Sequence, residues 1–403
     1  MLDSFDNIHV YVYYSNYINI MTTPFTILCF SWNAGGLRLC EVTSQAEADK
    51  SRSGVIAYVM SKEKCVAPDF LTNLQGIIQD RQPSLIVMTT QSESSLDTYF
   101  HARALPASMS EINYSLLKRE VNAEVLEFFY KNEVPGGNPK SNALRISIYA
   151  QNNILSDLQF GEQSLNDDES KGQYLETCGN ADTNFRHSSG SICSYVWHPT
   201  YGKFAFMTTH FAAGIGINVD YSLYRSYAKS SNNICLISLL YEYDLNVRDD
   251  YRPDYIFILG DLNYDIVVPG KNSQEAISDL TTNLSINKLR EYQAYDELKS
   301  AMNDIVLHGF KEGVNGDGPL FLPTWNLSRT RDDTCVPDEN TTNISSDCFT
   351  LQEKGFGWHD RIIYKNNLTS DYTINCTEYN RIDIGNMHLS NNAGVIGLFQ
   401  ITQ

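Results

Sequence analysis

The stretch ILGDLNYDI, residues 258–266, indicates the fold of this chain more clearly than any other. It overlaps the apolar run YIFIL, residues 255–259, which is typical of a buried strand. Gly260 follows this run, and Asp261 and Asn263 come directly after it. Residues two apart on an extended chain point the same way, so the carboxylate and the amide are expected to share one face. Together they could activate and orient a water molecule or hold a phosphate oxygen. The alternative, favoured for Asp-Leu-Asn in isolation, is an Asx turn that closes the strand.

Three other apolar runs also meet polar groups at one end. The runs FSWN and MTTH finish on Asn33 and His210, and GWHDRII enters a strand through Asp360 and Arg361. Alone, such a histidine is more often structural than catalytic, and an Asp-Arg pair is usually a supporting ion pair. Because sheet scaffolds build sites where several strand ends converge, the four runs together predict a functional site.

The hydrophobic pattern along the chain predicts alternating strands and helices. Strands are expected over residues 25–33, 84–90, 144–150, 191–198, 203–210, 255–260, 360–364 and 394–402, and helices over 68–82, 111–131, 221–243 and 285–304. The residues PTYG at 199–202 predict a hairpin turn. The expected architecture is an α/β (α+β) fold of two packed, mainly antiparallel β-sheets with helices outside.

The same pattern suggests a simple domain organisation. Residues 1–24 are expected to form an irregular lead-in, and residues 25–403 a single domain. Two polar stretches, near 161–190 and 327–357, are expected to be surface insertions. No repeat or low-complexity linker divides the chain.

Composition limits the classes of function. With 403 residues, 42% hydrophobic and 19% charged, the chain is expected to be globular. Its net charge of -18, from 30 basic and 48 acidic residues, works against nucleic-acid binding, which needs a basic surface. A local basic patch could still accept a small anionic substrate.

Cysteine usage and hydropathy bear on the compartment. The nine cysteines are scattered and include no CxxC pair, so neither a disulfide framework nor a zinc site is expected. No apolar stretch is long enough for a transmembrane helix, and the N-terminal residues lack the pattern of a signal peptide. The expected location is intracellular, in the reducing cytoplasm.

Five motifs occur in an order that resembles a known family. SWNAGG, TTHFAAG, ILGDLNYDI, FLPTWN and GWHDRIIY are similar to the ordered motifs of the inositol polyphosphate 5-phosphatases, which share the endonuclease/exonuclease/phosphatase fold related to DNase I. The resemblance runs from about residue 26 to the C-terminus. It implies a DNase I-like sandwich and a magnesium-dependent phosphatase of inositol phosphates or phosphoinositide head groups.

The resemblance also implies roles for individual residues. Asp261 would activate the attacking water, Asn263 would orient the water or the phosphate, and His210 would stabilise the phosphoryl group. Asn33 would lie near the metal, and Asp360 would support the catalytic constellation.

Two metal- and phosphate-binding motifs depart from the family pattern. The Leu-Gln-Glu motif appears as TTQSESS, so Ser92 stands at the glutamate position and Glu93, the candidate metal ligand, follows one residue late. A bulge or an irregular turn could return Glu93 to the required face. The Ser-Asp-His motif appears as Ser390-Asn391-Asn392, which makes Asn391 a candidate metal ligand and Asn392 a catalytic candidate. Asparagine can form hydrogen bonds but cannot carry the imidazolium charge.

Three basic residues of the family pattern are also replaced. Gly-Asn-Lys-Gly is represented by a segment containing Ser189, the lysine of Pro-Thr-Tyr-Lys is Asn326, and the arginine after Asp-Leu-Asn-Tyr is Asp265. Ser189, Asn326 and Arg361 are the remaining substrate-binding candidates. Loss of one phosphate donor typically reduces the rate by roughly a hundredfold or more.

Two functions follow as alternatives. The retained His210, Asp261, Asn263 and Asp360 favour a magnesium-dependent phosphatase with impaired activity. The substituted glutamate, lysine and Asp-His positions favour a catalytically inactive pseudophosphatase that acts as a binding or structural protein. On the question of turnover, the inactive alternative is slightly favoured over the active one. A nuclease of the same fold is disfavoured because HFAAG and DLNY are phosphatase-like and the chain is acidic.

Overall fold

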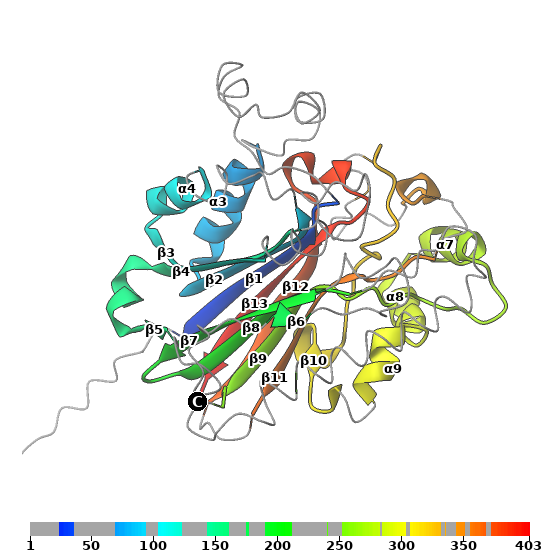
Figure 1. Cartoon of the computed structure of the whole chain (residues 1–403). Coiled ribbons are helices and arrows are strands. Elements are labelled where there is room, and N and C mark those ends of the chain that lie inside the picture. The colour runs from blue at the N-terminus through cyan, green and yellow to red at the C-terminus, as the bar shows by residue number, and fades with distance from the viewer. Residues whose placement is uncertain are drawn as a thin grey trace, which may run out of the picture.

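Two mixed β-sheets pack face to face in the computed structural model, with helices on their outer sides (Figure 1). The structure describes residues 24–35, 69–93, 104–122, 143–160, 175–176, 190–211, 240, 252–282, 284–303, 307–331, 335, 344–350, 355–367 and 372–403. This architecture confirms the predicted two-sheet fold class.

The first sheet has six strands in the order β12-β13-β1-β2-β4-β3. They are β1 (Phe25–Asn33), β2 (Leu85–Glu93), β3 (Tyr114–Asn122), β4 (Ala143–Gln151), β12 (Thr373–Ile382) and β13 (Gly394–Thr402). Only the β1–β2 pair among them is parallel.

The second sheet has the order β10-β11-β9-β8-β7-β5, with β6 also paired to β7. Its strands are β5 (Gln159–Phe160), β6 (Leu175–Glu176), β7 (Gly190–His198), β8 (Gly202–His210), β9 (Tyr255–Asp261), β10 (Lys311–Glu312) and β11 (Asp360–Asn366). Among these described strands, only β8 and β9 are parallel, and β7 and β8 form the predicted hairpin.

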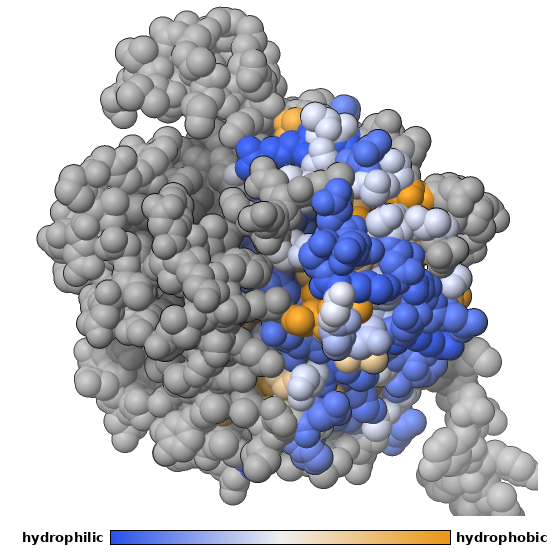
Figure 2. Space-filling view, turned by 90° about the vertical axis from the view of Figure 1, so that its right-hand side faces the viewer, coloured by the Kyte–Doolittle hydropathy of each residue, from blue (hydrophilic) through white to orange (hydrophobic). Residues whose placement is uncertain are grey.

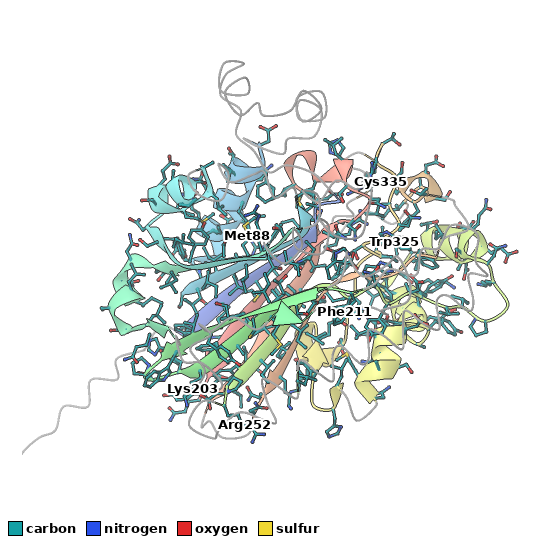
Figure 3. The ribbon with its side chains drawn as sticks, in the orientation of Figure 1. Met88, Lys203, Phe211, Arg252, Trp325 and Cys335 are labelled. Atoms are coloured by element: carbon teal, nitrogen blue, oxygen red, sulfur yellow. A yellow bond between two sulfur atoms is a disulfide. The ribbon has the colours of Figure 1, made fainter. Side chains whose placement is uncertain are left out.

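One end of the sandwich collects the polar strand ends. The carboxyl ends of the parallel pairs meet there, and β11, antiparallel to β9, begins there. In register, Asp261 lies opposite both His210 and Asp360. Figure 3 shows Lys203, near the start of β8, and Phe211, just after its end, at opposite ends of the sheets, with Trp325 on the Phe211 side.

The core explains why the strands appear in the sequence as continuous apolar runs. On β1, Ile27 and Cys29 face the second sheet, whereas Phe30 and Trp32 face the helices on the outer side. Both faces of the strand are therefore buried, and alternation of polar and apolar residues is lost.

Helices cover the outer faces. The helices α3 (Asp69–Arg81) and α4 (Leu105–Glu111) pack on the first sheet, and Phe70 of α3 stacks near Trp32. Helices α7 (Ser273–Thr282), α8 (Ile286–Gln293) and α9 (Glu297–Asn303) lie beside the second sheet (Figure 1). Where the structure is described, the face that carries them is mainly hydrophilic (Figure 2).

Several predicted elements differ from the structure. The helix expected over 111–131 is wrong in its described part, because α4 ends at Glu111 and β3 pairs with β4 there. Asn113 adopts a positive φ of 67°, which stops a helix. The helical stretch 285–304 is two helices, and β12 and α7 were not predicted. Apart from Leu240, the expected helix 221–243 lies outside the described residues.

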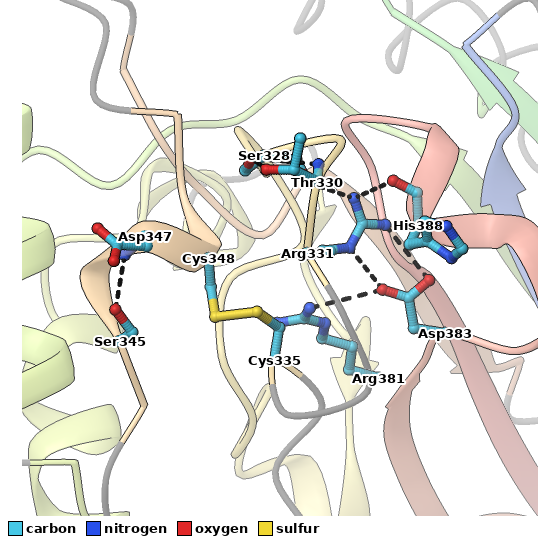
Figure 4. Close-up of a disulfide and its surroundings, with 10 residues drawn as sticks. All are labelled: Ser328, Thr330, Arg331, Cys335, Ser345, Asp347, Cys348, Arg381, Asp383 and His388. Carbon is cyan, nitrogen blue, oxygen red and sulfur yellow. Dashed lines mark hydrogen bonds and ion pairs between the residues drawn. A yellow bond between two sulfur atoms is a disulfide. The ribbon is translucent and has the colours of Figure 1, made fainter.

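The cysteine prediction needs a correction. Cys335 and Cys348 form a disulfide, whose surroundings Figure 4 shows, whereas Cys29, Cys193 and Cys376 are buried. Disulfides are rare in the reducing cytosol, so the cysteine pattern no longer supports an intracellular location. In the described part of the chain, no helix is long and apolar enough to span a membrane.

Candidate active site

Two adjacent aspartates form the centre of the candidate site. Asp261 is the last residue of β9, Asp360 is the first residue of β11, and both are almost completely buried. Gly260 precedes Asp261 for a steric reason. A Cβ at this position would lie 1.9 Å from the carbonyl oxygen of Thr209 on the neighbouring strand.

Asn33 joins both aspartates to the first sheet. Its side-chain Nδ2 donates to Oδ2 of Asp261 over 2.6 Å, and its backbone N–H donates to Oδ1 of Asp360 over 2.7 Å. Its own Oδ1 accepts the N–H of Gly35 at 2.9 Å. The site thus spans the two sheets, as the convergence of strand ends predicted.

Asn392 supplies a second amide to the same pair. Its Nδ2 donates to Oδ2 of Asp360 over 2.7 Å and to Oδ2 of Asp261 over 3.2 Å. Ser390 fixes this segment, because its hydroxyl donates to the carbonyl oxygen of Asn33 and accepts the N–H of Asn392. Two neutral amides therefore surround two carboxylates.

Burial reduces the charge of the cluster. It raises the pKa of Asp360 well above its usual value, and the neighbouring Asp261 carboxylate raises it further. Burial lowers the pKa of His210, although Asp261 opposes that change. His210 Nε2 lies 3.9 Å from Oδ2 of Asp261, too far for a direct hydrogen bond. Both shifts favour the neutral forms.

Asp261 forms the Asx turn considered as the alternative for Asp-Leu-Asn, and Asn263 closes it. β9 ends at Asp261, and Asn263 has a positive φ of 51°. Its backbone N–H donates to Oδ1 of Asp261 over 3.0 Å, and its Nδ2 donates to the carbonyl oxygen of Phe211 over 2.6 Å. The extended geometry assumed from the sequence was wrong, because the chain turns immediately after the strand.

A second histidine, which sequence analysis did not single out, lies at the cluster. His359 precedes Asp360, and its Nε2 lies 2.7 Å from Oδ1 of Asp265. Its Nδ1 lies 3.8 Å from Oδ1 of Asp261. The Trp325 ring stacks on the imidazole, with centroids 4.3 Å apart and planes at 9°. The only signal in the sequence was its place in the motif GWHDRIIY.

Arg361 has a structural role, so its expected role in substrate binding is corrected. The side chain is fully buried, and its guanidinium forms ion pairs with both Asp296 and Glu312. It also donates to the carbonyl oxygen of Trp358. A guanidinium held in this way is not available to a phosphate group.

Arg331, also missed from the sequence, organises the segment that carries Asn392. The buried guanidinium pairs with Asp383 at 2.6 Å (Figure 4). It also donates to the backbone carbonyl oxygens of Ser328, Met387, His388, Ser390 and Asn392. Arg331 lies four residues before Cys335 and close to the disulfide (Figure 4). We call Arg331 the clamp of the segment that carries Asn392, because its guanidinium holds the backbone of that segment.

The other predicted residues are placed less centrally. Asn326 is buried, and its backbone oxygen accepts the N–H of Thr350. The backbone oxygen of Asn391 accepts the N–H of Leu327, and its Oδ1 lies near Gly35. Ser189 lies outside the described residues.

A backbone irregularity is present where Glu93 needs one. Thr90 pairs with Arg145 and Glu93 pairs with Ala143, so three steps along β2 match two along β4. This shift has the form of a β-bulge, which can re-aim a side chain. Only the backbone of Glu93 belongs to the described structure.

The donor chemistry fits a hard cation. The site offers the oxygens of Asp261, Asp360 and Asn33, and beside Asn33 lies Gln91, whose buried Oε1 has no hydrogen-bond partner among the described residues. Magnesium binds through one or two carboxylates and keeps several waters. In the same part of the chain, no group of three or more His, Cys, Asp or Glu side chains is arranged to hold a metal. The residues fit an ion held by few protein ligands.

Comparisons with known proteins agree with the fold. A family model described as endonuclease/exonuclease/phosphatase family 2 matches residues 144–394. No curated protein sequence gives a significant match. The structure of Cimex nitrophorin in its ferrous NO complex is similar with a TM-score of 0.54 and 18% identity, covering 94% of this chain and 99% of that one. The inositol polyphosphate 5-phosphatase domain of SPsynaptojanin, in complex with inositol (1,4)-bisphosphate and calcium, gives 0.53 and 13%, covering 94% and 84%.

Proposed function

Since this chain belongs to the endonuclease/exonuclease/phosphatase family, we propose that it is a magnesium-dependent phosphomonoester hydrolase of the inositol polyphosphate 5-phosphatase type, with reduced turnover. The observation that carries this proposal is the assembly of Asn33, Asp261 and Asp360 by direct hydrogen bonds. Residues far apart in the sequence meet there at the end of both sheets.

The geometry supports a division of roles. Asp261 would accept the proton of the attacking water, and Asn33 and Asn392 hold its Oδ2 in a fixed orientation. Neutral His210 can donate a hydrogen bond to a phosphate oxygen from the edge of the site. Magnesium, held by Asn33 and the carboxylates, would supply charge stabilisation to the phosphoryl group. Asp360 would support Asp261 from the adjacent strand.

The proposed substrate is an inositol phosphate or a phosphoinositide head group. Its support is the resemblance of the motifs and the similarity to a domain solved with inositol (1,4)-bisphosphate. The family also includes nucleases by its name, so membership leaves nucleic acid open as a substrate. The net charge of -18 favours the small anionic substrate over DNA or RNA.

A second candidate is a non-catalytic binding protein on the same scaffold. It is favoured by the position of Asn392, whose neutral amide bridges Asp261 and Asp360 but cannot exchange a proton near neutral pH. The similarity to nitrophorin adds support, since that protein carries a ferrous NO complex on this fold.

Phosphate release from inositol trisphosphate with added Mg²⁺ separates the two candidates. The enzyme proposal expects release that Asp261→Asn abolishes, while the matched control Asp317→Asn, at an exposed ion pair, leaves it unchanged. Release no greater than that of buffer, at enzyme concentrations equal to the substrate, would support the binding protein instead. Nicking of plasmid DNA that Asp261→Asn removes would identify a nuclease.

A further inference from the structure

An unpaired buried nitrogen faces the central carboxylate. Nδ1 of His359 is inaccessible to solvent and has no hydrogen-bond partner among the described residues. Its nearest charged neighbour is Oδ1 of Asp261 at 3.8 Å. Buried polar atoms are normally satisfied, so one that is left open beside a carboxylate needs a physical explanation.

The other parts of His359 are tightly held. Nε2 lies 2.7 Å from Oδ1 of Asp265, and the Trp325 ring stacks on one face of the imidazole. The backbone N–H of His359 donates to the hydroxyl of Thr324 over 2.9 Å. These contacts fix the plane of the ring, and Nδ1 is directed toward Asp261 by the structure around it.

The two oxygens of Asp261 differ in their surroundings. Oδ2 already accepts amide hydrogens from Asn33 and Asn392, whereas Oδ1 accepts one backbone N–H, from Asn263. His359 lies on the Oδ1 side. Oδ1 therefore retains capacity for a further partner. A hydrogen bond from Nδ1 to Oδ1 requires a proton on Nδ1, so the ring that donates to both Asp265 and Asp261 is the imidazolium, and the 3.8 Å separation would have to shorten in the complex with substrate.

We propose that His359, anchored by Asp265, is a positioning residue that holds Oδ1 of Asp261 for reaction. This inference rests on the proposed hydrolysis. In this arrangement Asp265, which replaces the arginine of the family pattern, has a role of its own, because its carboxylate fixes the imidazole of His359. Asp261 is then oriented by amides on one oxygen and by an imidazole on the other.

A purely structural role is the competing explanation. The Asp265–His359 contact could serve only to attach the loop after β9 to the start of β11. Two backbone hydrogen bonds already make that attachment, from Leu262 N to His359 O at 2.8 Å and from Ile266 N to Phe356 O at 2.9 Å. The connection between the two segments therefore does not depend on the imidazole alone.

Two variants of His359 separate these roles. His359→Asn keeps a polar group near the position of Nδ1 and loses the contact with Asp265, whereas His359→Gln keeps a group near Nε2 and loses the one that faces Asp261. We expect His359→Gln to lower kcat by about a hundredfold with KM changed less than threefold, and His359→Asn to retain at least tenfold more activity than His359→Gln. Melting temperatures of both variants identify any general loss of folding.

The opposite order of activities, with His359→Gln close to the wild type, would assign His359 a structural role and overturn the proposal. Equal kcat for the wild type and both variants would also overturn it. A fall in activity that parallels the fall in melting temperature across the two variants would likewise assign His359 a structural role.

Nitrogen NMR provides a readout that does not require turnover. The His359 imidazole signals are assigned by their absence in His359→Gln and compared between the wild type and Asp261→Asn, with Asp317→Asn as control. We expect the Nδ1 resonance to move by several ppm in Asp261→Asn and to stay in place in the control. A wild-type protein without hydrolysis but with this shift would refute the proposed function and leave the contact standing. An unmoved Nδ1 resonance would refute the contact itself.

Discussion

The side-chain amide of Asn392 donates a 2.7 Å hydrogen bond to Oδ2 of Asp360. At this position an imidazole could make the same contact and also carry a proton, which an amide cannot do. The geometry of the site is thus retained while its acid–base capacity is reduced. That difference leads to a direct test of why turnover is expected to be low.

We predict that the double variant Asn391→Asp/Asn392→His gains activity. The new imidazole lies where it can pair with Asp360, and the new carboxylate adds an oxygen ligand near Gly35. Phosphate release from inositol trisphosphate with Mg²⁺ should rise about tenfold or more over the wild type. Asn375→His, at an exposed position on β12, is the control and should have no effect. Equal rates for all three proteins would show that Asn391 and Asn392 do not limit turnover.

Much of the architecture was predictable because strands buried on both faces leave continuous apolar runs. The predictions for β1 and β9 match the observed strands to within one residue. The region of β3 failed because Leu116 and Lys118 suit a helix locally, and only the pairing with β4, distant in sequence, makes it a strand. β12 was not predicted, although its alternation of buried and exposed positions is typical of a strand with one face buried.

The site was predictable where several apolar runs each carried polar residues at one end, because strand ends of that kind converge in a sheet. Asn33, Asp261 and Asp360 do meet, as the strand ends indicated. The contact between Asp265 and His359 joins residues 94 positions apart, and neither suggests the other in the sequence. Arg331 and the disulfide were missed for the same reason, because their partners are set by loop packing rather than by periodicity.

Arg331 should be essential for stability. Arg331→Gln leaves the buried Asp383 carboxylate without its bidentate partner, with Arg381 at 3.8 Å as its remaining ion pair, and removes donors from several carbonyl groups. Breaking a buried pair in this way typically costs about 3–5 kcal/mol. Urea unfolding followed by fluorescence should show this loss. The matched variant Arg329→Gln, at an exposed position, should change the free energy of unfolding by less than about 0.5 kcal/mol.

Arg331→Lys tests the shape of the guanidinium. A lysine keeps the charge but cannot serve Asp383 and several carbonyl oxygens at once. We expect it to lose most of the stability lost by Arg331→Gln. Hydrogen exchange over residues 385–392 should accelerate in both variants. Wild-type protection of this segment in either one would contradict the assignment of Arg331 as its clamp.

The Cys335–Cys348 disulfide should form in the protein isolated without reductant. Non-reducing digestion and mass spectrometry are expected to give one linked peptide pair containing both residues. For a loop of 13 residues, removal of the cross-link in Cys335→Ser/Cys348→Ser should lower the free energy of unfolding by about 3 kcal/mol. Both cysteines alkylated as free thiols would rule out the bond. Cys376, whose pKa burial raises to about 12, should resist alkylation in the folded state.

The pH dependence of stability should include a contribution from Glu378. Arg81 donates two hydrogen bonds to this carboxylate, one of them at 2.7 Å, and this contact lowers the pKa of Glu378. A carboxyl whose pKa is lower in the folded state stabilises the fold above its unfolded pKa of about 4.3, and this contribution is lost as the pH falls through the folded value. The pair is partly exposed, so about 1 kcal/mol is expected.

Urea unfolding of wild type and Glu378→Gln at pH 7 and pH 3 measures this contribution. The wild type should be more stable than Glu378→Gln by about 1 kcal/mol at pH 7, and the difference should shrink toward zero at pH 3. Glu291→Gln, which removes an exposed pair with Lys288 within α8, is the matched control and should change stability less. A difference for Glu378→Gln that stays constant between the two pH values would mean that the Arg81 contact does not lower the pKa of this group in solution. The side chains of Arg81 and Glu378 would then stabilise the contact between α3 and β12 by packing alone.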